Sequence, residues 1–419
     1  MRLLALVALS CVLCVPASRA QEARDNLKAV SNKTEATPTQ EACKDSAVVA
    51  GAPAASACGP AAKDCGRVWA AAEYLLWWTK GQHAPPLVTT SPAGTPAAQA
   101  GVLGQPGTTV LFGGPLNDGL RSGGRFSLGY WLDDCHECGI GGSFFMLQDS
   151  VEHFSINSIG DPIVVRPIFD VNGGVASAQI TAFPGIAAGC LDITAFNRFL
   201  GADLFVRKPI CCDCCDCCDP CRGQFEVLAG YRFLYLHDSL VINELVADLA
   251  NAGTAFALSD SFRTTNQFHG VDVGVLWHKR SGRWSAEAMA RLAVGATFQR
   301  TSIQGSTSIV AANAPAAVFP GGLLALSSNI GIYENTALSI VPELRLSVGY
   351  YLCENVRAFV GYNFLYWTNV VRAAEQIDLR INTNLLPPSV GGAPAFPAFL
   401  DRRNDFWAQG INFGVSINY

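Results

Sequence analysis

The amino-acid sequence predicts an all-β protein, a transmembrane antiparallel up-and-down β-barrel of about ten strands. Two observations lead there. After the N-terminus no 18 uninterrupted apolar residues occur, so a membrane-spanning helix is not expected. From residue 67 onward, segments that alternate between apolar and polar residues follow one another. A chain without membrane helices can cross lipid only as a closed barrel, because other folds leave backbone polar groups unsatisfied there.

The last strand shows this alternation most clearly. Large apolar residues occupy every second position, and the residues between them are Gly, Ser or Asn. A strand of this kind has one apolar face and one polar face, as a lipid-facing barrel strand requires. We expect the apolar residues to face lipid and to act as a barrel-closing C-terminal signal: Ile411, Phe413, Val415, Ile417 and Tyr419.

The N-terminal 20 residues have the pattern of a signal peptide. Arg2 precedes an apolar run from Leu3 to Val15, and Ser18-Arg19-Ala20 places small residues at the cleavage-critical positions. We therefore expect cleavage after Ala20 and export. A lipoprotein signal that uses Cys11 or Cys14 is the alternative, but the apolar run before Cys11 is short and no small residue precedes Cys14.

Residues 21–66 are predicted to be a flexible periplasmic leader, because they show no hydrophobic period. The barrel domain then covers residues 67–419. Loss of Arg2 and Arg19 with the signal peptide changes the formal net charge from -5 to -7. A mildly acidic chain without a polybasic run does not fit a nucleic-acid partner.

Ten alternating segments are predicted as strands, an even number, as bacterial barrels have. Short connections alternate between them with long ones, which is typical of periplasmic turns and extracellular loops. The short ones are Asp133–Cys138, Lys208–Gly223, Lys279–Arg283 and Glu354–Asn355. The strands are Val68–Trp78, Gly124–Leu132, Gly139–Asp149, Ala195–Arg207, Gln224–Leu236, Gln267–His278, Trp284–Gln299, Pro342–Cys353, Val356–Trp367 and Trp407–Tyr419.

Charged residues of these strands fall on one face only. In Trp284–Gln299 the apolar face runs from Trp284 to Phe298, whereas Glu287 and Arg291 belong to the other face. Because a ten-stranded barrel is narrow, Arg side chains that pair with carboxylates would occupy much of its lumen. We expect a plugged or very narrow barrel with this lumen charge network: Glu73, Arg125, Asp203, Glu226, Arg232, Asp272, Glu287, Arg291, Glu343, Arg345 and Arg357.

Several sequence stretches resemble the putative β-barrel porin-7 family, and the resemblance extends from about Trp69 to Tyr419. It implies a bacterial outer-membrane barrel, and it brings no catalytic residues and no cofactor. The stretches are Trp69–Trp78, Pro85–Thr90, Gly101–Gly104, Leu111–Gly114, Ser122–Trp131, Leu228–Phe233, Thr265–Gly270, Gly321–Leu324, Gly361–Trp367, Gln376–Asp378 and Phe406–Gly414.

A cysteine-rich turn departs from the family pattern. Three interpretations are open for it: a disulfide-stapled periplasmic turn, a thiolate metal site with C-x-x-C spacing, or a low-complexity insertion without a role. The exported setting favours disulfides. The residues concerned, with a second pair in the preceding periplasmic turn, are Cys135, Cys138, Cys211, Cys212, Cys214, Cys215, Cys217, Cys218 and Cys221.

Two classes of function follow from the sequence. The first is a narrow porin-like channel with a charged Glu/Arg lumen. The second is a plugged barrel that anchors the envelope through its cysteine-rich turn and long surface loops. No spacing of Ser, His and Asp supports an enzyme. The expected partners are outer-membrane lipid, the barrel assembly machinery and periplasmic envelope proteins.

Overall fold

The computed structural model describes residues 66–133, 136–210, 224–251, 253–311 and 314–419. The predicted signal peptide, the leader up to residue 65 and the turn at residues 211–223 lie outside these ranges. Among the described residues no helix is long and apolar enough to span a membrane.

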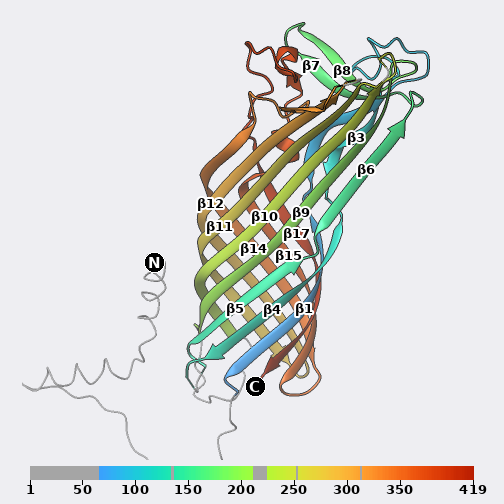
Figure 1. The fold of residues 1–419 in the computed structure, drawn as a ribbon. Helices are drawn as coiled ribbons and strands as arrows, with labels where there is room; N and C mark the ends of the chain where they lie inside the picture. The colour runs from blue at the N-terminus through green and yellow to red at the C-terminus, as the bar shows by residue number, and fades with distance from the viewer. Residues whose placement is uncertain (1–65, 134–135, 211–223, 252, 312–313) are drawn as a thin grey trace, which may run out of the picture. The chain divides into compact units, whose positions relative to one another are not determined.

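Ten strands pair in an antiparallel ring (Figure 1). The ring closes where β1 pairs with β17, in a register that joins Trp69 to Asn418 and Thr79 to Ala408. This confirms the predicted fold class, and each predicted strand lies within or largely within a strand of the ring. These strands are β1 (Val68–Thr79), β4 (Leu120–Trp131), β5 (Gly139–Leu147), β9 (Ala187–Pro209), β10 (Gln224–Asp248), β11 (Ala255–Ser281), β12 (Trp284–Val310), β14 (Gly331–Tyr351), β15 (Val356–Val371) and β17 (Arg403–Asn418).

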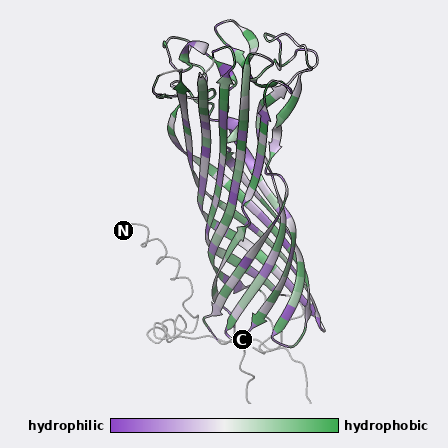
Figure 2. Cartoon of the chain, turned by 45° about the vertical axis from the view of Figure 1, so that its right-hand side comes forward, coloured by the Kyte–Doolittle hydropathy of each residue, from purple (hydrophilic) through white to green (hydrophobic). Residues whose placement is uncertain are grey.

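The outer face of the ring carries an apolar belt of exposed side chains. Figure 2 shows hydrophobic residues recurring along the strands of the ring. Phe413 and Val415 of β17 are 49% and 42% exposed, as a lipid-facing strand requires. On β12 the belt runs from Trp284 to Phe298, which are also exposed. His269 lies beside Phe298, and their ring centroids are 5.6 Å apart. These aromatic side chains mark the boundaries of the belt.

Several strands are longer than the sequence predicts. The expected long loop between Leu236 and Gln267 is mostly strand, because β10 continues to Asp248 and β11 begins at Ala255. The two strands stay paired up to Ala247 and Ala255. The prediction was wrong here because it required an apolar outer face. Beyond the belt, the outer face of these strands carries polar residues such as Asn243 and Ser259, which form a hydrogen bond of 2.8 Å.

Short connections, together with Gly66 and Tyr419, lie at one end of the barrel, which we call the turn end. At the opposite loop end, a second sheet has the order β16-β7-β2-β3, with β8 paired to β7. Its strands are β2 (Gln82–Thr90), β3 (Thr109–Leu116), β7 (Val164–Asp170), β8 (Val175–Ala182) and β16 (Arg380–Ile381). Two further strands, β6 (Ser150–Ser158) and β13 (Ala317–Pro320), pair with β9 and β12.

The second sheet, which we call the cap, packs against the inner face of the long strands. Leu87, Val88 and Ile168 from the cap share one buried cluster with Leu240 and Phe262 from β10 and β11. The loop-end interior is therefore a hydrophobic core. Burial of this core keeps the chain between β1 and β4, and between β6 and β9, folded over the barrel mouth.

Substitution of Val273 by Arg tests the belt. Val273 is 51% exposed on the outer face of β11, midway between Trp277 and His269. Because Arg in the middle of the hydrocarbon layer is costly, we expect a loss of about 2–4 kcal/mol in the free energy of unfolding. Thr265→Arg, on the same face beyond His269, is the control and should cost about 0–1 kcal/mol. Guanidinium titration of the refolded chain in phospholipid vesicles measures both, and equal costs would contradict the position of the belt.

Candidate functional site

The barrel lumen is filled in successive layers, and the first contains charged side chains. Four carboxylates and four arginines form one chain of ion pairs across seven strands, in which the two signs balance. We call this set the charge layer. Its members are Glu73, Arg125, Asp203, Arg232, Asp272, Arg291, Glu343 and Arg345.

Each carboxylate of the charge layer has an arginine partner. Arg345 lies 2.5 Å from Glu73, and Arg125 lies 3.5 Å from the same carboxylate. Glu343 lies 2.6 Å from Arg232. Asp272 pairs with Arg232 at 3.2 Å and also with Arg291. A buried charge is tolerable only when it is paired, so removal of any one member would leave the layer with an unbalanced buried charge.

Two smaller charged clusters lie nearer the turn end. Arg207 binds Glu226 through two hydrogen bonds of 2.6 and 2.7 Å, a bidentate pair. Its guanidinium also lies 4.7 Å from the centroid of Trp131. Arg357 lies 2.8 Å from Glu287, and its Nε donates to Ser285 Oγ at 2.6 Å. These clusters hold the wall together below the charge layer.

An apolar layer follows directly toward the loop end. On β1 and β10 it occupies the inward positions next to the charged ones: Leu75 and Trp77 follow Glu73, and Leu234 and Leu236 follow Arg232. None of its members is more than 5% exposed. The members are Leu75, Trp77, Phe145, Leu147, Phe199, Leu234, Leu236, Phe268, Ala293, Val341, Leu365, Trp367, Val370, Phe406 and Ala408.

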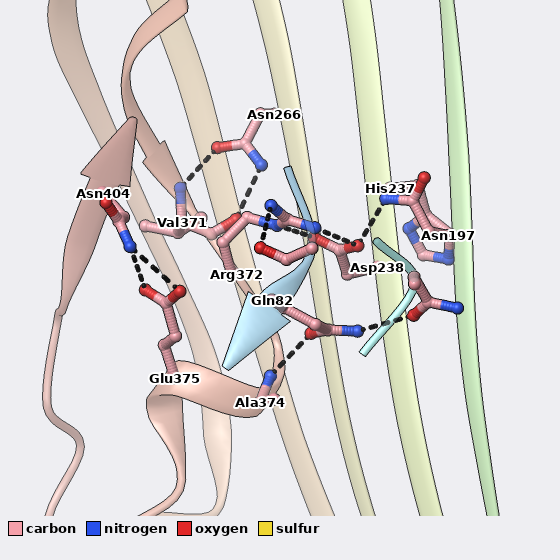
Figure 3. Close-up of polar contacts among 12 residues, drawn as sticks. Gln82, Asn197, His237, Asp238, Asn266, Val371, Arg372, Ala374, Glu375 and Asn404 are labelled. Carbon is pink, nitrogen blue, oxygen red and sulfur yellow. Dashed lines mark hydrogen bonds and ion pairs between the residues drawn. The ribbon is translucent and has the colours of Figure 1, made fainter. Parts of the chain in front are cut away.

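A third layer holds the segment that follows β15 inside the barrel (Figure 3). Arg372 is 1% exposed, and its Nε donates to Asp238 of β10 at 2.6 Å. Its Nη1 also donates to the carbonyl of Lys80 at 3.1 Å. The side chain of Asn266 on β11 makes two hydrogen bonds of 2.8 Å with the backbone of Val371. We call Arg372 and Asp238 the latch, because they fasten residues 372–402 to the barrel wall.

A second buried pair fastens the cap. Arg166 of β7 lies 3.0 Å from Glu244 and 2.8 Å from Asp260, on β10 and β11. Burial by itself lowers the pKa of Arg166, but attraction to Asp260 and Glu244 outweighs it and raises the pKa above its ordinary value. The Asp260 carboxylate also accepts from the backbone N–H groups of Leu324 and Ala325. Arg166 therefore stays charged and joins the cap to the long strands.

The structure places all eleven predicted lumen charges on the inner face and in ion pairs. Arg207, Asp238, Arg372, Arg166, Glu244 and Asp260 were missed. The alternation of β10 continues past Leu236, so Asp238 and Glu244 could have been found from the sequence. Arg166 and Arg372 could not, because they lie on segments that turn into the barrel.

The predicted cysteine-rich site lies almost entirely outside the described residues. Of its nine cysteines only Cys138 is described; it is disulfide-bonded and 8% exposed. Cys135 and the seven cysteines from Cys211 to Cys221 lie outside the described ranges. Disulfide pairing or metal binding in the turn therefore stays a prediction.

These layers and the lipid-facing belt define an outer-membrane β-barrel protein with a filled lumen. The family model described as Putative beta barrel porin-7 matches residues 69–419. The chain belongs to this family, which confirms the resemblance seen in the sequence. A search of curated proteins finds no match.

Three solved structures of outer-membrane proteins are distantly similar to the chain. The outer membrane protease OmpT from Escherichia coli is 9% identical with a TM-score of 0.37, over 84% of this chain and 97% of that chain. A mutant of the TodX monoaromatic hydrocarbon channel is 10% identical with a TM-score of 0.22, over 85% and 91%. A FadL homologue from Pseudomonas aeruginosa is 8% identical with a TM-score of 0.20, over 85% and 90%. None of these likenesses carries an argument about activity.

Substitution of Arg372 by Ala tests the latch. It leaves the fully buried carboxylate of Asp238 without its cation, so we expect a loss of about 3–5 kcal/mol in the free energy of unfolding. Arg403→Ala is the matched control, because Arg403 pairs with Asp401 at 3.0 Å with side chains 36% and 44% exposed. An exposed pair contributes about 0–1 kcal/mol. Guanidinium titration in micelles compares them, and similar losses would contradict the latch.

Proposed function

We propose that this protein is a plugged structural barrel of a bacterial outer membrane, closed to diffusion along its axis. The apolar layer carries the proposal. Fifteen side chains from nine of the ten ring strands meet there, and none is more than 5% exposed. In a water-filled pore, inward side chains would be accessible. A dry apolar constriction also excludes ions, because they cannot shed their hydration there.

The cap and the latch support the same proposal. The cap covers the loop end with a hydrophobic core, and the Arg372–Asp238 pair fastens the start of residues 372–402 to the wall. We infer that the cap faces the cell exterior and forms the surface layer of the protein. The turn end then faces the periplasm, where the cysteine-rich turn and the leader would contact envelope proteins. That last part rests on the sequence alone.

A narrow porin-like channel is the alternative. It would use the charge layer as its selectivity region, but solutes would also have to pass the apolar layer. The charge layer is itself balanced in sign, so it offers little preference for cations or anions.

Planar bilayer recordings test the proposal. The refolded mature chain should give no discrete conductance steps in high salt. Trp77→Ala combined with Trp367→Ala removes the two largest side chains of the apolar layer, and we expect steps to appear. Trp284→Ala is the control, because Trp284 is 61% exposed on the outer face. Steps from the unmodified chain, shown to be folded, would overturn the proposal in favour of the channel.

A further inference from the structure

The backbone ladder between β14 and β15 ends inside the membrane belt. β14 pairs with β12 from Gly331 to Tyr350, but its pairing with β15 begins only at Glu343. The next residue toward the loop end, Pro342, has no N–H to donate. Proline within sheets is typical of edge positions where pairing stops. From Pro342 toward the loop end, β14 is therefore an edge strand on its β15 side.

Two side chains bridge this gap. Continuation of the register from Glu343 and Leu365 places Thr368 opposite Ile340. There, the Thr368 hydroxyl accepts from Ile340 N at 2.9 Å and lies 3.4 Å from Ile340 O. Asn369, with a left-handed φ of 58°, donates from Nδ2 to Leu338 O at 2.8 Å. Side chains thus replace the backbone bonds that a continued ladder would make. We call the contact of 338–342 with 366–370 the seam.

The seam lies within the lipid-facing belt. Its neighbour Thr336 is paired with Phe298, which marks the belt boundary, and the seam residues are nearer the centre. Leu338 and Ile340 point outward and are 71% and 44% exposed. In hydrocarbon, backbone polar groups must be satisfied within the protein. A wall joined by two side chains is therefore weaker than one joined by a ladder.

The loop-end half of β15 turns toward the lumen and away from β14. Gln299 of β12 donates to the carbonyl of Asn369 at 2.6 Å, and the indole of Trp367 donates to Thr297 at 3.0 Å. These contacts lie behind β14 and draw β15 away from it. Trp367, which is 0% exposed, consequently lies directly behind the seam.

An apolar hollow lies at the foot of the seam. Its volume is about 470 Å³, and its lining includes Pro342, Leu344, Phe364, Leu292 and Val275. The hollow is wide open to the outside, and its surface is almost entirely apolar. Leu292, Leu344 and Val275 belong to the lipid-facing belt, where acyl chains are the surrounding medium.

We propose that the seam is a lateral entry site for an aliphatic chain from the surrounding lipid leaflet. The chain lies in the hollow beside Pro342 and reaches Trp367 when the bridges from Thr368 and Asn369 open. This goes beyond the proposed plugged barrel, because a barrel closed along its axis can still admit a chain through its wall. Conductance tests the plug, whereas the experiment below tests the seam.

The experiment measures quenching of Trp367 by lipid. The full mature chain is refolded in phosphatidylcholine vesicles that are brominated in the middle of the acyl chain. The part of the quenching that Trp367→Phe abolishes belongs to Trp367, and it measures how closely an acyl chain approaches the seam. Thr368→Val with Asn369→Gly removes both bridges, and glycine keeps the left-handed backbone unstrained. We expect this part of the quenching to rise at least about twofold, as for a locally opened wall.

The control is Thr265→Val, which removes a threonine hydroxyl from the outer face of β11, away from the seam; it should leave the quenching unchanged. Quenching by way of Trp367 that is equal in the double variant and in the unmodified chain would overturn the proposal.

Discussion

The structure depends on one constraint: in hydrocarbon, every backbone N–H and C=O must find its partner within the protein. The β1–β17 pairing meets it by closing the ring. Closure with ten strands leaves a lumen only a few side chains wide. Inward side chains from opposite walls are therefore in contact, and the interior becomes a packed core.

The layers of the interior differ in how their side chains offset the loss of hydration on burial. Charged side chains lose hydration, so they occur as a balanced chain in which Glu343 and Asp272 each face two arginines. The next layer contains aromatic and aliphatic side chains that need no partner. Arg125 links the two layers, since its guanidinium pairs with Glu73 and lies 5.2 Å from the Trp77 ring centroid.

Toward the loop end the ring gives way to an open wall that is completed by the cap. β9 to β12 and β14 continue beyond the belt, whereas β1 ends at Thr79 and β17 begins at Arg403. The cap covers the inner face of this wall, and its arginine, Arg166, is neutralised by carboxylates from two wall strands. The seam lies at the transition, where β15 leaves its neighbour and joins the interior. The inward turn of β15 thus helps to fill the lumen, but it also weakens the wall between β14 and β15.

The sequence by itself determined the barrel, its strand number and the face of each strand. Because side chains alternate with a period of two residues, the sequence assigns each one to a face of its strand whatever the neighbouring strands are. Lipid favours apolar side chains such as Ile411, whereas the lumen accommodates charged ones such as Arg291. Only the tertiary structure decided which charges meet, how far β10 and β11 extend beyond the belt, and that Arg166 and Arg372 enter the lumen. These depend on register and on chain segments folding back from the loop end. One such contact joins Gln82 to Ala374, which lies 292 positions away, and no local pattern encodes it.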